Sequence, residues 1–217
     1  MRFYSTIALI LCVACEEPIP KAPGLLPPID GSAGARAELS MSASAAGALG
    51  VLGILGVALD LGQTRVLSDR EPSEAVSFEV PARIELLGGG EIFEAESIPP
   101  ATYFAAALEP QADKTIALEL ELSLLGLTHT VRVDGLPPLE LRCEEIAVDL
   151  PNASALRVDI ELELDNIVGL LLDLLPGLLP SIPLSILTID PESEPTLHGQ
   201  LSSLFQEKWT ARCSVGE

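Results

Sequence analysis

Two histidines are the side chains of this sequence best suited to acid–base or nucleophilic chemistry. His129 and His198 stand about seventy residues apart, and no Gly-x-Ser-x-Gly, His-Glu-x-x-His or phosphate-loop signature accompanies either of them. A Ser-His-Asp arrangement built on His129 is the catalytic alternative. Because the chain has 32 acids, no carboxylate pair stands out as a general acid and base. The sequence therefore predicts no catalytic residues, and we do not expect an enzyme.

A run of four acids at every second position is the candidate for binding a cation, because carboxylate oxygens are ligands that Ca²⁺ prefers. The run consists of Asp159, Glu161, Glu163 and Asp165. A spacing of two is also the spacing of one face of a β-strand. An EF-hand loop needs glycine at its sixth position, where this run has Leu164. We interpret the run as a solvated strand face, with a cation site shared with neighbouring strands as the alternative, and predict no metal ion and no cofactor.

Four cysteines are present, and their chemistry depends on the compartment of the protein. Cys12 and Cys15 close an apolar N-terminal stretch, whereas Cys143 and Cys213 lie in the body of the chain. An even pair of thiols oxidises in an exported protein, so the sequence predicts a disulfide between Cys143 and Cys213. The alternative is a metal site made with the two histidines, but these residues lack the short spacings typical of such sites.

The N-terminus has the features of a secretory signal peptide: one positive charge at Arg2, a short apolar run and small residues before Cys15. The segment Leu11-Cys12-Val13-Ala14-Cys15 resembles the lipobox of bacterial lipoproteins, with Cys12 where that family usually has leucine. The resemblance implies cleavage before Cys15 and attachment of a diacylglycerol to its thiol. It also implies retention at the outer membrane, because Glu16 follows the cysteine. The alternative is an ordinary secreted protein that is cut nearby.

These features predict three parts of the chain. Residues 1–14 are the signal peptide, 15–35 a tether rich in proline and glycine, and 36–217 the folded domain. Proline fixes φ and removes a hydrogen-bond donor, so the tether is expected to be extended. The remaining part, of about 180 residues, is long enough to bury the core of a single domain.

The composition limits the partners of this domain. The net charge is -20, and removal of Arg2 with the signal peptide changes it to about -21. Such an acidic chain repels phosphate backbones, which excludes nucleic acid, and it repels anionic lipid head groups. The lipid on Cys15 is therefore the expected contact with the membrane. Aromatic residues make up only 4%, so the core must consist of aliphatic side chains.

Alternation of apolar and polar residues predicts that most of the domain is β. The clearest patterns are an antiparallel hairpin over 115–133 and a strand over 156–164. Helical spacing begins near Asn166 and ends at Pro176-Gly177, and a final helix is expected from Leu197 to Trp209. Shorter strands are expected over 37–43, 61–66, 76–80, 84–86, 102–108 and 139–150. The predicted class is mainly β, an antiparallel β-sandwich with one or two accessory helices.

A local motif points to the same architecture. Ile98-Pro99-Pro100-Ala101-Thr102-Tyr103 resembles the turn and tyrosine strand of transthyretin-like sandwiches, which occur in bacterial surface lipoproteins of unknown function. Ala101 stands where that family usually has glycine. The resemblance implies a sandwich and no particular activity.

Two segments, 40–59 and 167–189, are unusually apolar. Ser40 to Leu59 is 20 residues without a charge, and it contains Gly47, Gly50, Gly53 and Gly56. A transmembrane helix has this length, but each glycine costs a helix about 1 kcal/mol. A loop that dips into the membrane and a buried hairpin or helix are the other interpretations, and we favour the buried one.

Three hypotheses for function follow. The first is an outer-membrane lipoprotein, facing the periplasm or the cell surface, with a structural or binding role toward an envelope protein or a glycan. The second is a carrier of apolar ligands or lipids that uses segments 45–59 and 167–189, whose apolar side chains exceed what a small sandwich obviously needs. The third is a hydrolase that uses His129.

Overall fold

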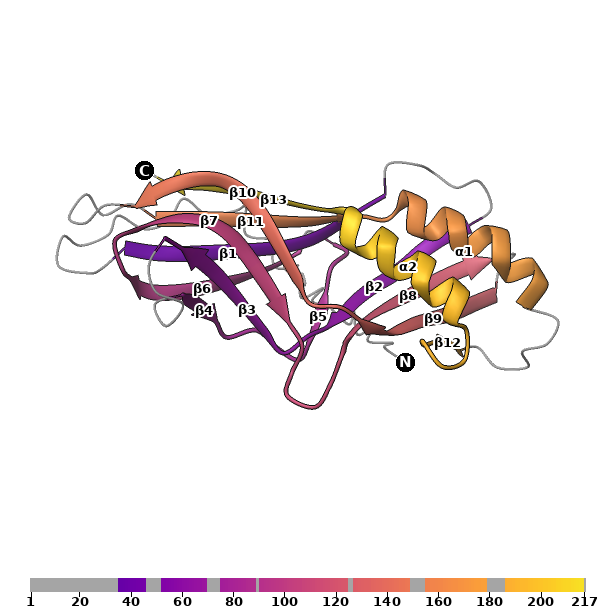
Figure 1. The fold of residues 1–217 in the computed structure, drawn as a ribbon. Helices are drawn as coiled ribbons and strands as arrows, with labels where there is room; N and C mark the ends of the chain where they lie inside the picture. Colours follow the sequence, from indigo (N-terminus) through magenta and orange to yellow (C-terminus); the bar gives the residue numbers. More distant parts are fainter. Residues whose placement is uncertain are drawn as a thin grey trace, which may run out of the picture.

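The computed structural model describes residues 35–45, 52–69, 75–88, 90–124, 127–148, 155–178 and 186–216. The expected signal peptide and nearly all of the expected tether lie outside these ranges. The described chain is mainly β, as predicted. Two sheets face each other at one end of an elongated molecule, and a third sheet with two helices forms the other end (Figure 1).

Sheet A forms one layer of the sandwich. Its strand order is β13 (Trp209–Gly216), β11 (Ala155–Glu163), β1 (Ala35–Ser44) and β6 (Glu91–Ile98). The central pair β1 and β11 is parallel, with Leu39 opposite Val158, whereas the outer pairs are antiparallel. The strand predicted over 156–164 is therefore confirmed as β11, and it lies in the middle of the sheet.

Sheet C forms the second layer and is antiparallel throughout. Its strand order is β10 (Leu139–Val148), β7 (Ala101–Glu109), β3 (Gln63–Ser68) and β4 (Val76–Phe78). Tyr103 on β7 is fully buried, and its hydroxyl donates a hydrogen bond of 2.7 Å to the carbonyl oxygen of Pro99.

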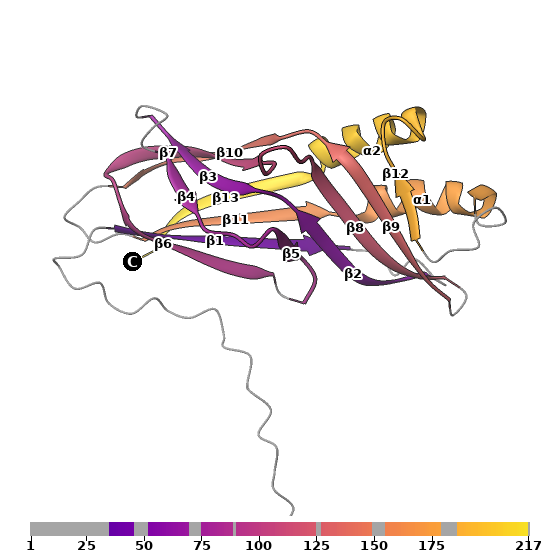
Figure 2. The same ribbon diagram turned by 90° about the horizontal axis from the view of Figure 1, so that it is seen from below.

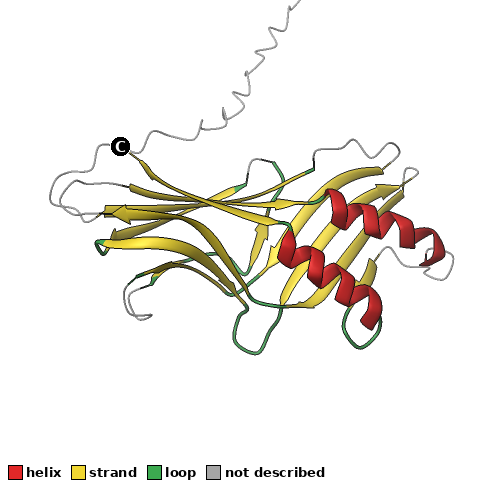
Figure 3. Cartoon of the chain, turned by 45° about the horizontal axis from the view of Figure 1, so that its top comes forward, coloured by secondary structure: helices red, strands yellow, loops and turns green. Residues whose placement is uncertain are grey.

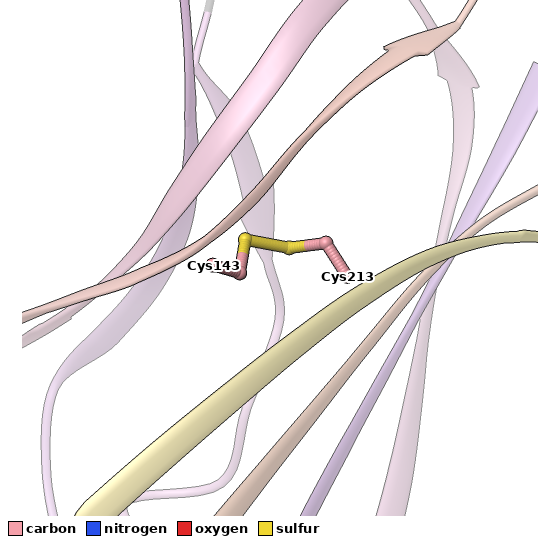
Figure 4. Close-up of a disulfide and its surroundings, with 2 residues drawn as sticks. All are labelled: Cys143 and Cys213. Carbon is pink, nitrogen blue, oxygen red and sulfur yellow. A yellow bond between two sulfur atoms is a disulfide. The ribbon is translucent and has the colours of Figure 1, made fainter.

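The predicted disulfide is present. Cys143 lies on β10 and Cys213 on β13, which are the edge strands of sheets C and A, and their Cα atoms are 5.6 Å apart (Figure 4). This separation is typical of a disulfide. The bond therefore links the two layers of the sandwich along one edge.

Sheet B extends the molecule away from the sandwich (Figure 2). Its strand order is β12 (Ile186–Ile189), β9 (Leu127–Leu136), β8 (Ile116–Leu124), β2 (Leu52–Asp60) and β5 (Arg83–Glu85). The predicted hairpin over 115–133 is confirmed as β8 and β9, in which Leu120 pairs with Val131. Both of these side chains are fully buried, so this face of the sheet belongs to the core.

Helices α1 (Asp165–Leu178) and α2 (Pro195–Glu207) lie over the apolar face of sheet B (Figure 3). Ile167 of α1 and Phe205 of α2 belong to the same continuous core as the buried side chains of the three sheets. Neither helix of the described residues is long and apolar enough to cross a membrane.

The end of α2 differs from the prediction. The helix ends at Glu207, and Trp209 begins strand β13, where it pairs with Leu162. The indole of Trp209 packs edge-to-face on Phe205 with ring centroids 5.6 Å apart. Trp209 thus continues the apolar face of the helix after the backbone has become extended, which is why its spacing indicated a longer helix.

The apolar segment 45–59 is partly a strand. Residues 46–51 lie outside the described ranges, and β2 begins at Leu52. Val57 and Leu59 are buried in the common core, and so are Val168 and Leu171 of the second apolar segment. Large parts of both segments therefore complete the core, whereas Leu55 and Ile186 are exposed.

Candidate binding cleft

A polar cleft of about 590 Å³ opens where sheet B meets the sandwich. Four stretches of chain build it: the end of β2, the start of β5, the connection between β7 and β8, and the second half of β9. The residues that line it are Asp60, Leu61, Ala82, Arg83, Gln111, Asp113, Lys114, Thr115, Arg132 and Asp134. The cleft lies on the face of sheet B that points away from the helices, because its residues alternate with the buried ones along each strand.

Arg132 on β9 is one of two arginines that organise this face. Its Nη1 atom lies 2.8 Å from Oδ2 of Asp60 and 3.4 Å from Oε2 of Glu119. Its Nε atom donates to Oδ1 of Asp134 over 2.9 Å. A single guanidinium therefore connects β9, β8 and β2, because its donors point in several directions at once.

Arg83 on the short edge strand β5 is the second arginine. Its Nη2 atom donates to Oε1 of Glu119 over 2.8 Å, and its Nε atom donates to Oε1 of Glu85 over 3.1 Å. A longer contact of 3.8 Å joins Nη1 to Oδ1 of Asp60. Asp60 and Glu119 are thus shared by both arginines, and the six charged side chains form one network across four strands.

The network lowers the pKa of Glu119 and raises that of Arg132. The hydrogen bond from Arg83, together with the charges of Arg83 and Arg132, lowers the pKa of Glu119 despite partial burial. Burial acts to lower the pKa of Arg132, but the hydrogen bond with Asp60 and the charges of Asp134 and Asp60 outweigh it and raise that pKa. Glu119 and Arg132 are therefore held in their charged forms.

The rim of the cleft is the β7–β8 connection, which the backbone holds in place. The N–H of Gly62 donates to the carbonyl of Glu109 over 2.9 Å, and the N–H of Lys114 donates to that of Gln111 over 2.9 Å. A Cβ atom at Gly62 would overlap the backbone of Gln111, so only glycine allows this approach. Asp113 has a φ of 63°, a left-handed conformation that few non-glycine residues adopt.

The charges that line the cleft balance. Three acids (Asp60, Asp113, Asp134) and three bases (Arg83, Lys114, Arg132) give a formal charge of zero. The whole chain, by contrast, carries -20. The lining of the cleft is thus formally neutral and rich in both donors and acceptors, with the carboxylates of Glu85 and Glu119 beside its arginines.

His198 lies behind the wall of the cleft. It is 8% exposed, and its Nε2 atom is 2.8 Å from the backbone oxygen of Asp134. Gly135 follows with a φ of 77°, and a Cβ atom there would come within 3.3 Å of the same Nε2. His198, which the sequence offered only as a candidate for catalysis or metal binding, thus fixes the backbone beside a cleft-lining carboxylate.

His129 does not take part in the cleft. It is partly buried on β9 and pairs with Leu122, on the apolar side of the sheet, as the alternation predicted. It is five positions from Asp134 along the strand, a distance of about 17 Å. The structure therefore does not bring the two histidines together around the cleft.

The four alternating acids do not line the cleft. Asp159, Glu161 and Glu163 are on β11, and Asp165 begins α1. Asp159 and Glu163 are exposed, as expected of a solvated strand face, whereas Glu161 and Asp165 are partly buried and Asp165 belongs to a helix. In the part of the chain that the structure describes, no three His, Cys, Asp or Glu side chains gather as a metal site would require.

The cleft residues themselves were not predicted. The sequence shows Glu119 and Arg132 on the polar sides of a hairpin, which was the available signal for their pairing. Nothing in the spacing indicates that Asp60 and Arg83 join them.

Comparisons with known proteins add no further assignment: no family model, no curated protein and no solved structure matches this chain.

Proposed function

We propose that this protein is an outer-membrane lipoprotein anchored through Cys15, and that its domain has a binding role in the cell envelope carried out by the cleft. The anchor rests on the lipobox-like sequence that ends at Cys15. The binding role rests on one observation, the neutral cleft in which Arg83 and Arg132 are fixed by shared carboxylates.

The arrangement suits binding better than catalysis. Neither histidine lines the cleft, and its arginines and acids neutralise one another. Side chains fixed by several ion pairs lose little conformational freedom when a ligand binds, which favours affinity. The chemistry of the cleft is therefore recognition by preorganised hydrogen bonds.

A neutral, hydroxyl-rich ligand such as a glycan fits this cleft best among the expected partners. Each sugar hydroxyl both donates and accepts, and the cleft offers guanidinium donors beside carboxylate acceptors. An anionic ligand would have to displace the carboxylates that already pair with both arginines. The negative charge of the rest of the chain further opposes the binding of an anionic ligand.

The carrier hypothesis has less support. Much of segments 45–59 and 167–189 is buried in the core, although Leu55 and Ile186 are exposed, and the cleft is lined mainly by polar side chains. A carrier needs a large apolar cavity. The binding role is therefore the function that we propose.

Calorimetric titration with a tetramer of N-acetylglucosamine, a neutral envelope-type glycan, tests the proposal. A sulfated tetrasaccharide serves as the anionic comparison. We expect binding of the neutral sugar, no binding of the sulfated one, and at least a tenfold loss of affinity in Arg132→Met.

Arg142→Met is the matched control, because Arg142 is 80% exposed on the edge strand β10 and lies outside the cleft. It should bind like the parent protein. Failure of the parent to bind the neutral tetramer, or equal binding by Arg132→Met, would show that the cleft is not a site for this glycan.

A further inference from the structure

The end of sheet B farthest from the sandwich is free of charge. We call this end the sheet B tip and define it as Leu52–Leu55, Leu122–Leu124, Leu127–His129 and Ile186. The register places these residues together, because Leu124 pairs with both Leu52 and Leu127. The tip contains no Asp, Glu, Lys or Arg, although the chain has 32 Asp and Glu and 12 Lys and Arg residues.

Large apolar side chains are exposed at this tip. Leu55 is 54% exposed, Leu127 65% and Ile186 58%. The described residues expose only two other large apolar side chains, Ile92 and Val215, and both are on sheet A. Exposed apolar groups that gather at one end of a protein mark a contact surface.

Glu121 is the charged residue of β8 that lies nearest to the tip, and the uncharged end of the strand begins after it. Glu121 is exposed on β8 and pairs with Gly56 and Thr130. Strand β8 continues for three residues beyond it, to Leu124, a length of about 10 Å. The sequence next to the strand ends of the tip, residues 46–51, 125–126 and 179–185, also includes no charged residue.

We infer that the sheet B tip binds the surface of a lipid bilayer, into which the exposed side chains of Leu55, Leu127 and Ile186 insert. The uncharged length of about 10 Å agrees with the depth of about 5–10 Å that interfacial segments reach. The tip has neither aromatic residues nor arginine, which dominate the hot spots of protein interfaces. Aliphatic side chains without charge match the hydrocarbon boundary instead.

The sequence before the domain is long enough for this contact. The 19 residues 16–34 reach at most about 65 Å from Cys15 to Ala35. Strand β1, whose first residue is Ala35, begins at the end of the molecule opposite the tip (Figure 2), and β11 followed by α1 covers about 50 Å between the two ends. A lipid on Cys15 and the tip can therefore contact the same bilayer, with the domain lying along it.

Of these observations, only the reach of residues 16–34 depends on the proposed lipid anchor. The test therefore uses a chain that lacks the anchor. The probe is the mature chain 15–217 with Cys15→Ala, floated with vesicles of neutral phosphatidylcholine. We expect it to float with the vesicles at both low and high salt. Leu127→Asp combined with Ile186→Asp should lower its partition coefficient at least tenfold, because carboxylates oppose insertion.

Ile92→Asp combined with Val215→Asp is the matched control, since it removes equally exposed apolar side chains from sheet A. It should float like the parent. Circular dichroism verifies that each variant is folded. Leu127→Trp gives a second readout that keeps the tip apolar, and its emission should shift to the blue with vesicles, whereas that of Ile92→Trp should not.

Three results would overturn the inference. The parent chain fails to float, or the tip and control variants lose flotation equally, or the Leu127→Trp emission does not shift. A concentration-dependent dimer that the Asp variants abolish, without vesicle binding, would assign the tip to a second copy of this chain. None of these results bears on whether Cys15 is acylated or whether the cleft binds a glycan.

Discussion

Arg132 reaches across strand β8 to Asp60. Its Nη1 atom lies 2.8 Å from Oδ2 of Asp60, although the two residues belong to β9 and β2, which β8 separates. The residue of β8 that pairs with Asp60 is Ala117. Its side chain is short and buried, so it leaves room above it for the guanidinium of Arg132. This contact fixes one wall of the cleft.

Removal of that guanidinium should lower stability measurably. Arg132→Met leaves Asp60, Glu119 and Asp134 as neighbouring carboxylates with one arginine fewer. Because these side chains are about one-third exposed, we expect a loss of about 1–2 kcal/mol in the free energy of unfolding. Urea unfolding measures it. Arg142→Met, whose pair with Glu140 is exposed, should change stability by less than about 0.5 kcal/mol.

The same network should make stability depend on pH. The pKa of Glu119 is lower in the folded protein, through its hydrogen bond with Arg83, than in the unfolded chain. Its contribution is therefore complete above the unfolded pKa of about 4.3 and is lost as the pH falls through the lower folded value.

Unfolding at pH 7 and at pH 3 in the parent and in Glu119→Gln measures this contribution. Glu119→Gln should be less stable than the parent at pH 7, and the difference should shrink toward pH 3. A difference that stays constant over this range would mean that the charge of Glu119 does not stabilise the fold.

The disulfide should make a large contribution. It joins residues 70 positions apart in sequence and links two sheets. Cys143→Ser combined with Cys213→Ser should reduce the free energy of unfolding by about 2–5 kcal/mol, because the unfolded chain gains entropy. Addition of dithiothreitol should lower the stability of the parent and leave that of the double variant unchanged. Equal stability of the two proteins without reductant would contradict the link.

Two glycine-to-alanine substitutions should distinguish a glycine that a close backbone contact requires from one that only weakens a helix. Gly62→Ala forces a Cβ atom onto the backbone of Gln111 at the rim of the cleft, and we expect a loss of about 1–3 kcal/mol. Gly199→Ala places its Cβ in open space on α2 and should stabilise the protein by up to about 1 kcal/mol. Thermal unfolding of both variants distinguishes the two effects, and a neutral Gly62→Ala would show that the rim can move.

Local patterns explain which parts of the fold could be predicted. The hairpin of β8 and β9 and the strand β11 have strict alternation, which depends only on which face is buried. The parallel pairing of β1 with β11 joins residues more than a hundred positions apart, so no local pattern encodes it. The division into three sheets was missed for the same reason.

The cleft illustrates the limit for functional residues. Asp60, Arg83 and Arg132 become neighbours only because β2, β5 and β9 belong to one sheet. Charged residues are common on exposed strand faces, so their types alone did not distinguish these from the acids of β11. The disulfide was predictable because only two cysteines remain beyond the N-terminal stretch.

Intact mass spectrometry of the membrane-associated protein tests the central claim, a lipid anchor on Cys15, most directly. We predict a mature chain that begins at Cys15 and carries the added mass of two or three acyl chains, and no such species in Cys15→Ala. A mature chain that begins at another residue, or one that begins at Cys15 without acyl mass, would contradict the lipid anchor.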